Sequence, residues 1–391
     1  MPTRKTQEDN SASLAELQSP PCIDILLPSK ERFGPANAGA VSTVVHDLIR
    51  ASDTPACFHV FGTPVTTPFA DVDFTALLPR QRWLNGNNIG FAKAYLHHLR
   101  GRPKPDLVEV HGRCHVAALI KEKRPDLKVA LYLHNDPRDM KASRTAAERT
   151  ALLRQMAAVI CVSDYIGGCF LDDLDVSDDM AAKVRTARNG VARRLTAPST
   201  KSPMVLLVGR MVPEKGILEC AEAVARALAG HPEWEVVIVG ATHFQTAPPG
   251  SYEDKVKAAL APLGSRARMT GFLPVDEVRS LQERAAIIAC PSLWQEPMGK
   301  TAIEALAAGS ALLTTRRGGI PEAAEGRAHI VDDPSVDSFA DAIGRMVSDD
   351  HYRKSLQEAA WQDFPFTDIA MARDADRIRA HAISAALAPA K

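Results

Sequence analysis

Short apolar runs alternate with helical patterns along the first half of the chain. The runs lie at residues 22–28, 107–110, 129–133 and 159–162. After the first run, the loop GPANAGA leads into an amphipathic helical pattern over 41–51. Buried strands that alternate with helices in this way are typical of a parallel, doubly wound sheet. We therefore predict one Rossmann-like domain over residues 21–192.

A second series of strand patterns follows the polar connection ARRLTAPSTKSP, which begins at residue 192. Its strand candidates are MVLLVG, WEVVIVG, ARMTGFL, AIIACPS and SALLTT, with glycine or small polar residues at their carboxyl ends. We predict a second Rossmann-like domain over 203–364. An amphipathic helical pattern without a following strand fills 365–391, and the polar residues 1–20 predict a flexible tail.

The composition agrees with two globular domains in a reducing compartment. A chain of 391 residues exceeds what one hydrophobic core usually supports. Lys+Arg and Asp+Glu both total 47, so no overall field favours a nucleic acid partner. The 7 cysteines form no C-x-x-C pair. Neither a signal peptide nor an apolar run of about 20 residues is found, so we predict a cytoplasmic location.

The clearest chemical signal is the segment from Trp294 to Gly309, which follows one predicted strand and precedes another. Gly299 permits close approach of the backbone to a ligand. Lys300 and Thr301 then open a helix, whose free N–H groups and dipole favour an anionic phosphate. The segment therefore predicts a phosphate site at the start of this helix.

Two glutamates flank that phosphate site. Glu296 lies on the loop before the helix, and Glu304 lies about one turn into it. Their carboxylates can accept hydrogen bonds from a sugar and from a ribose while phosphates lie between them. The alternative is that Glu296 caps the helix and Glu304 is a solvated surface residue.

A second loop decides between these interpretations. In residues 208–217, VGRMVPEKGI, a strand ends at Gly209, and Arg210 and Lys215 precede a helix. Two cations in one loop can clamp a diphosphate, since Arg offers a planar fork and Lys a compact ammonium. A solvated loop with surface charges remains the alternative when this loop is taken alone.

These segments resemble the retaining glycosyltransferases of family 4. The resemblance runs from about residue 20 to the end, and it is most specific in GRMVPEKG, GFLP, CPS, the E-x7-E segment and GGIPE. It implies an α/β GT-B fold, in which two Rossmann-like doubly wound domains face a central cleft. It also implies that the helix at 365–391 completes the domain at 21–192.

The resemblance assigns roles to the residues of the second domain. Arg210 and Lys215 match the residues that hold the donor diphosphate. Glu296 matches the one that binds donor-sugar hydroxyls, and Glu304 the one that binds the ribose. Backbone N–H groups from Met298 to Thr301 would approach the sugar and phosphate.

The first domain resembles the family more loosely. Gly39, in the loop that begins at Gly34, is the match to a glycine near the donor phosphates. His134 resembles a histidine near the donor sugar, so we expect a catalytic role, although a lone histidine after a strand is more often structural. His111 and Arg113 are candidates for the acceptor side.

Two features depart from the family pattern. Lys300 stands where an apolar residue is common, and Arg316 and Arg317 precede the Gly-Gly turn. Extra positive charge beside the donor phosphate, or beside a charged substrate, is one interpretation. Outward-pointing, solvated side chains are the other.

The resemblance implies retention of anomeric configuration, and we expect a front-face displacement with a UDP-, GDP- or ADP-sugar as donor. The acceptor would be a hydroxyl of a glycan or lipid-linked sugar, in polysaccharide or lipopolysaccharide biosynthesis. No D-x-D motif follows a strand, so neither a metal nor another cofactor is required. A 2-epimerase acting on sugar nucleotides and a non-enzymatic sugar-binding protein are the alternatives. A dehydrogenase is disfavoured because no G-x-G-x-x-G follows a first strand.

Residues 74–105 contain no acidic side chain, six basic ones, and the aromatic residues Trp83, Phe91 and Tyr95. Such a segment can dock on anionic lipid, which would place the protein peripherally on the inner face of the cell membrane. A solvated basic face is the alternative.

Overall fold

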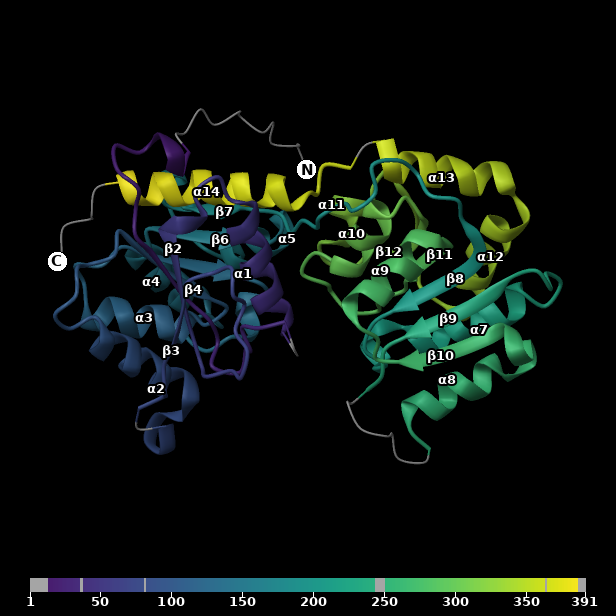
Figure 1. The fold of residues 1–391 in the computed structure, drawn as a ribbon, viewed down its shortest axis with the longest axis horizontal. Helices are drawn as coiled ribbons and strands as arrows, with labels where there is room; N and C mark the ends of the chain where they lie inside the picture. The colour runs from purple at the N-terminus through teal and green to yellow at the C-terminus, as the bar shows by residue number, and fades with distance from the viewer. Residues whose placement is uncertain (1–12, 36–37, 81, 243–249, 363, 386–391) are drawn as a thin grey trace. The chain divides into compact units, whose positions relative to one another are not determined.

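The structure is a computed structural model that describes residues 13–35, 38–80, 82–242, 250–362 and 364–385 (Figure 1). The chain divides into two compact units. Unit 1 consists of residues 1–189 together with 368–391, and unit 2 consists of residues 190–367.

Unit 1 is built on a seven-stranded parallel sheet in the order β3-β2-β1-β4-β5-β6-β7. Its strands are β1 Ile23–Leu26, β2 Phe58–Gly62, β3 Phe74–Ala76, β4 Leu107–His111, β5 Val129–Leu133, β6 Ala158–Cys161 and β7 Val184–Thr186. Its helices are α1 Ala40–Ala51, α2 Arg82–His98, α3 Cys114–Lys123, α4 Ala146–Gln155, α5 Asp164–Leu171, α6 Asp178–Ala181 and α14 Asp368–Ser384. The central strands β1, β4, β5 and β6 are buried along their whole length, as strands covered on both faces must be.

The last helix, α14, belongs to unit 1 although unit 2 precedes it in the chain. It packs on α1, β6, β4 and β7, and Figure 1 shows it in yellow beside the purple and blue elements of this unit. Met371, Ala375 and Ile378 lie on its buried side. Leu14, in a short 3-10 turn at Leu14–Glu16, is also buried and contacts α14, so this turn departs from the tail predicted for residues 1–20.

Unit 2 is built on a six-stranded parallel sheet in the order β10-β9-β8-β11-β12-β13. Its strands are β8 Ser202–Val208, β9 Glu235–Val239, β10 Ala267–Gly271, β11 Ala285–Cys290, β12 Ala311–Thr315 and β13 Ala328–Val331. Its helices are α7 Ile217–Ala227, α8 Tyr252–Leu260, α9 Val275–Arg284, α10 Lys300–Ala307, α11 Ile320–Ala324, α12 Val336–Ser348 and α13 Asp350–Gln362. Apolar faces of α7 and α12 pack together in its core.

The prediction of two doubly wound Rossmann-like units is confirmed. All strands predicted from apolar runs are present, within about two residues at their ends. The prediction missed β2, β3, β7 and β13. Of these, β3 and β7 are three-residue edge strands with partly exposed side chains, which leave no clear apolar run in the sequence.

Each sheet reverses its strand order once. In unit 1 the order runs outward in both directions from β1 and β4, and in unit 2 from β8 and β11. Loops that follow two such strands diverge to opposite sides, which leaves a crevice at their carboxyl ends where α/β proteins bind ligands. The fold therefore directs attention to the loops after these four strands.

Candidate active site

The two segments singled out in unit 2 meet at its strand-order reversal. The Arg210/Lys215 loop follows β8, and the Glu296 loop follows the neighbouring strand β11. The carbonyl oxygen of Glu214 accepts hydrogen bonds from the N–H groups of Leu293 (2.9 Å) and Trp294 (3.3 Å). These bonds join the two loops directly.

Lys215 and Glu296 form an ion pair at this junction. The Nζ of Lys215 lies 2.5 Å from Oε1 of Glu296, and the hydroxyl of Ser292 donates to the same oxygen at 2.8 Å. Glu296 is 6% exposed, so the ammonium compensates a carboxylate that would otherwise be costly to bury. The sequence predicted both charged residues, and the structure adds Ser292 to them.

Glycines allow the close approach of these loops. Gly216 has φ +65°, and a Cβ there would lie 2.1 Å from the carbonyl oxygen of Pro291. Gly318, after β12, has φ +59°, and a Cβ would lie 2.1 Å from the carbonyl oxygen of Glu296. That same carbonyl accepts a hydrogen bond from the N–H of Gly319 at 2.7 Å. The GGIPE segment therefore packs against the Glu296 loop and holds it through this backbone hydrogen bond.

The helix that follows Glu296 begins as the sequence predicted. Gly299 is the N-cap of α10 with φ +75°, and Lys300 and Thr301 are its first two residues, both half-buried. Met298 is buried, which fixes the loop immediately before the helix. An αL N-cap without a side chain leaves the first N–H groups of α10 without side-chain capping, as a phosphate site requires.

The other predicted residues of unit 2 surround this pair. Gly209 follows β8 directly, and the side chain of Arg210 is exposed with no partner among the described residues. Glu304 lies in the second turn of α10 and is half-buried. Its Oε2 accepts a hydrogen bond from Nε2 of Gln282 at 3.0 Å. This bond orients the Glu304 carboxylate and leaves its other oxygen for a ligand.

The two arginines before the Gly-Gly turn differ from each other. Arg316 is exposed and pairs with Asp332 (2.5 Å) and Glu325 (2.6 Å), which raise the pKa of its guanidinium. Its charge is therefore already compensated. Arg317 is half-buried, and its Nε is buried without a hydrogen-bond partner among the described residues.

In unit 1, His134 follows β5 and is hydrogen-bonded inside the protein. Its Nε2 lies 2.8 Å from Nδ1 of His111, the last residue of β4. Nε2 of His111 lies 2.8 Å from Oε1 of Glu109, and Arg379 of α14 binds both oxygens of Glu109 at 2.7 and 2.8 Å. The histidine predicted to be catalytic thus stands at one end of a buried polar chain.

The pKa shifts in this chain follow from burial and charge. Burial, reinforced by the neighbouring His111 and Arg113, lowers the pKa of His134 well below its usual range. Burial alone would raise the pKa of Glu109, but Arg379 and the His111 hydrogen bond outweigh it and hold that pKa below its usual range. His134 is therefore neutral and Glu109 ionised at neutral pH.

Gly39 is the N-cap of α1, and the space beside it is filled. A Cβ at Gly39 would lie 2.1 Å from Oε2 of Glu31, and this oxygen accepts a hydrogen bond from the N–H of Ser42 at 3.1 Å. A carboxylate of the protein itself thus occupies the anion-favouring start of α1. A role for Gly39 beside donor phosphates remains a prediction.

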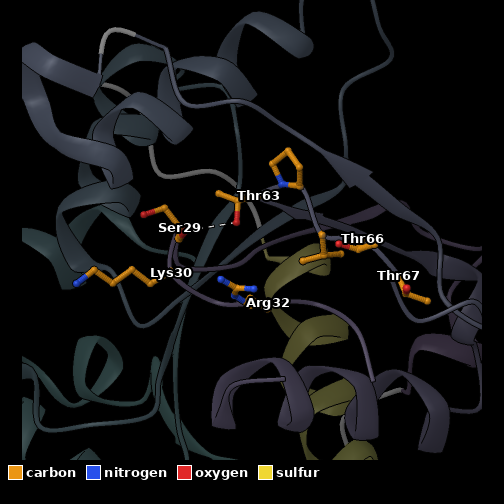
Figure 2. A pocket seen from close by; sticks show the side chains of 8 residues that line it. Ser29, Lys30, Arg32, Thr63, Thr66 and Thr67 are labelled. Atoms are coloured by element: carbon orange, nitrogen blue, oxygen red, sulfur yellow. Dashed lines mark hydrogen bonds between the residues drawn. The ribbon is translucent and has the colours of Figure 1, made fainter. Parts of the chain in front are cut away.

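A pocket of about 550 Å³ lies beside the loops that follow β1 and β2 (Figure 2). It is lined by Ser29, Lys30 and Arg32 from the first loop and by residues 63–67 from the second. The hydroxyl of Thr63 donates to the carbonyl oxygen of Ser29 at 3.3 Å, which ties the loops together. Neither cation has a partner among the described residues, so the pocket favours an anionic ligand.

Comparison with known proteins gives the family of this fold and site. Residues 192–363, nearly the whole of unit 2, match the family described as "Glycosyl transferases group 1". The protein is a glycosyltransferase whose second unit matches group 1 of these enzymes. This confirms the resemblance drawn from the E-x7-E and GRMVPEKG segments, and with it the prediction of an enzyme.

Relatives of this glycosyltransferase extend the match into unit 1. A putative glycosyltransferase of Bacillus subtilis is 27% identical over 65% of this chain and 67% of its own. A lipopolysaccharide 1,2-N-acetylglucosaminetransferase of Salmonella typhimurium is 22% identical over 83% of this chain and 89% of its own. The structure of Anabaena HepE in complex with UDP-glucose has a TM-score of 0.67 at 15% identity, covering 89% of this chain and 96% of that one. The last likeness confirms the GT-B fold.

The basic segment 74–105 is less suited to a lipid surface than its sequence suggests. Phe91 and Tyr95 are buried in unit 1, at 2% and 0% exposed, so they cannot insert into a bilayer. The side chain of Trp83 lies outside the described residues. No helix among the described residues is long and apolar enough to span a membrane. Any contact with anionic lipid would therefore rest on the basic side chains.

Sequence reasoning missed several residues of these sites. The sequence pattern indicates Ser292 only as part of a strand end, and it does not single out Glu109 or Arg379. A glutamate in the middle of an apolar strand was a usable signal, because a buried carboxylate needs a cationic partner. Nothing in the sequence shows that this partner is Arg379, some 270 residues away. Among the described residues, no cluster of three or more His, Cys, Asp or Glu side chains could hold a metal ion.

Proposed function

We propose that the protein is a retaining glycosyltransferase that moves a sugar from a nucleoside diphosphate sugar to a hydroxyl of a glycan or lipid-linked acceptor. The observation that carries this proposal is the cluster of Lys215, Glu296 and Ser292 at the carboxyl ends of β8 and β11. The same fold binds UDP-glucose in the Anabaena protein. A cation, a buried carboxylate and a helix start together match the phosphates and hydroxyls of such a donor.

In this site the diphosphate would lie between the start of α10 and the two cations. Arg210 is exposed and has no side-chain partner among the described residues, so its guanidinium can turn to a phosphate without breaking a bond to one of them. Lys215 is 27% exposed on its side chain and remains within reach of a ligand while it holds Glu296. Positive charge here would stabilise the diphosphate as it leaves the sugar.

Glu296 and Glu304 would orient the two sugar rings of the donor. Glu296 already accepts from Lys215 and Ser292 through Oε1, which leaves Oε2 for a hydroxyl of the transferred sugar. Glu304 offers one oxygen to the ribose while Gln282 holds the other. Hydroxyl donors suit these carboxylate acceptors, whereas a second phosphate would be repelled by them.

We propose a front-face displacement for the transfer itself. The leaving phosphate oxygen would take the proton of the acceptor hydroxyl, so the C–O bond to the donor breaks as the bond to the acceptor forms on the same face. His134 would support the sugar while positive charge develops at its anomeric carbon. We place the acceptor on unit 1, where the pocket at Lys30 and Arg32 suits one with a phosphate or carboxylate.

A sugar-nucleotide 2-epimerase of the same fold is the competing proposal. Such an enzyme would consume the nucleotide-sugar without an acceptor, whereas a transferase releases nucleoside diphosphate only when an acceptor is present. Acceptor-dependent release of the diphosphate therefore separates the two reactions.

The experiment begins with thermal-shift screening against UDP-, GDP- and ADP-sugars, because a bound donor stabilises the folded protein in proportion to its affinity. Lys215→Ala is then compared with Lys354→Ala, a surface lysine of α13 that is 65% exposed. We expect at least about a 100-fold loss of diphosphate release for the first, by analogy with other charge-stabilising donors, and no change for the second. Unchanged turnover in Lys215→Ala would refute the assigned role.

A further inference from the structure

A buried row of ionisable side chains links α14 to the carboxyl edge of the unit 1 sheet. Arg379, Glu109 and His111 are each 0% exposed, and His134 is 9% exposed. Each member is hydrogen-bonded to the next at 2.7 to 2.8 Å. The rings of His111 and His134 also stack on Tyr132, with centroids 4.7 and 4.9 Å away, which fixes their orientations.

The order of donors and acceptors along this row is determined by its charged end. Arg379 can only donate, so both oxygens of Glu109 accept from it and the carboxylate is ionised. An ionised carboxylate has no proton to give, so Nε2 of His111 must carry the hydrogen of the bond to Oε1 of Glu109.

Glu109 already accepts two bonds from Arg379, whose third bond goes to Asp376 at 2.8 Å, so a neutral ring at the fully buried His111 satisfies every bond of the row without adding a further buried charge. With His111 neutral, its Nδ1 is an acceptor, and the bond at 2.8 Å must be donated by Nε2 of His134. His134 is then a neutral ring with its hydrogen on Nε2 and a lone pair on Nδ1.

We propose that His111 and Glu109 are positioning residues that lock His134 in the Nε2–H tautomer, so that its Nδ1 accepts a hydrogen bond from a hydroxyl of the bound substrate. Arg379 of α14 anchors this arrangement by keeping Glu109 ionised. No partner of His134 Nδ1 is found among the residues that the structure describes, and the ring retains 9% exposure for such a contact.

The hydroxyl contact rests on the proposed function, whereas the tautomer lock concerns the free protein. A hydroxyl that donates to Nδ1 has its oxygen made more electron-rich, which favours charge development on the sugar in the transition state. A phosphate or carboxylate oxygen is repelled by the same lone pair. The arrangement therefore selects a sugar hydroxyl over an anionic oxygen at this position.

The tautomer is measured directly by ¹⁵N shifts and two-bond ¹H–¹⁵N couplings of histidine rings in the full-length protein without substrate. Assignment uses His134→Gln as a reference. We expect His134 to be neutral with its hydrogen on Nε2 between pH 6 and 9, because burial, His111 and Arg113 lower its pKa and outweigh the opposing effect of Glu109. A hydrogen on Nδ1 of His134, or a protonated His111 ring in this range, would overturn the lock.

Two variants separate hydrogen bonding from packing. His111→Asn places an amide oxygen where Nδ1 was and can accept from His134, whereas His111→Phe keeps a ring packed against Tyr132 and His134 and accepts nothing. We expect the Asn variant to keep the Nε2–H tautomer and the Phe variant to show a mixture. Identical spectra for the two variants would overturn the proposal.

Activity supplies a second readout. A single lost hydrogen bond predicts a reduction in kcat of about tenfold for His111→Phe, with donor KM unchanged and near-normal kcat in His111→Asn. Equal losses in both variants would mean that His111 acts only through packing. If no transfer is detected with any donor, the proposed function fails, but the tautomer spectra still decide the lock.

Discussion

Replacing Arg379 with Met should destabilise unit 1 far more than the same replacement of an exposed arginine. Arg379 is fully buried, donates to Glu109 at 2.7 and 2.8 Å and to Asp376 at 2.8 Å, and lies 4.9 Å from the ring centre of Phe58. Met fills much of the space but supplies no donor. Two buried carboxylates would then lose their cation.

The magnitude follows from this burial. Removing one partner of a buried ion pair costs about 3–5 kcal/mol, because the remaining charge stays unpaired in a poorly solvated site. The matched control is Arg50→Met, whose arginine lies 3.5 Å from Asp71 with both side chains more than half exposed. Exposed pairs contribute about 0–1 kcal/mol, so the control should be close to the wild type.

The pH dependence gives a second test of the cause. In the wild type, the lowered pKa of Glu109 contributes stability above the pKa of an unfolded glutamate, about 4.3, which is lost as the pH falls toward the folded value. In Arg379→Met, burial without the guanidinium should raise the pKa of Glu109, and the pKa of Asp376, which burial already raises in the wild type, should rise further. The free energy of unfolding of this variant is therefore retained at low pH, where the two carboxyls are protonated, and falls as the pH rises and they ionise. The difference between the two proteins should therefore widen between pH 5 and pH 8.

Urea unfolding followed by circular dichroism measures the difference. If Arg379→Met does not fold, Arg379→Met/Glu109→Gln removes one of the stranded charges and should recover part of the stability. A loss in Arg379→Met no larger than in Arg50→Met, or a difference that is the same at pH 5 and pH 8, would refute the reasoning.

Three further predictions concern substrate binding. Gly318→Ala should reduce the thermal shift caused by the donor, because its Cβ would lie 2.1 Å from the carbonyl oxygen of Glu296. Gly326→Ala is the control, since Gly326 has a similar positive φ but open space around it, and it should leave the thermal shift unchanged. An equal reduction in both variants would contradict the predicted clash. Lys30→Glu/Arg32→Glu should raise the KM for a phosphorylated acceptor at least about tenfold and leave the KM for the donor unchanged. Initial-rate measurements check this, and a rise in the donor KM alone would contradict the placement of the acceptor. Because Lys and Arg side chains carry the positive charge in the proposed donor site, EDTA should leave the transfer rate unchanged. A rate that is lost in EDTA and restored by added Mg²⁺ would contradict this assignment of the charge.

The sequence alone determined the fold class and the donor-site candidates. Buried parallel strands are continuous apolar runs, and the glycine and charged residues after β8 and β11 lie close to those strands in the chain. Local patterns of this kind therefore predicted Lys215, Glu296 and Gly299 together with the helix that follows them. Short edge strands such as β3 escaped prediction because their side chains are partly exposed.

Only the tertiary structure decided which distant residues act on one another. Oε1 of Glu296 accepts a hydrogen bond from Lys215, 81 residues away in the chain, because β8 and β11 are neighbours in the sheet. Glu109 is ionised because α14 returns to unit 1 and brings Arg379 to it. A buried charge has no preferred partner in the sequence. Its state is set by whichever group the packing places within hydrogen-bond distance, and that choice fixes the proton on His134.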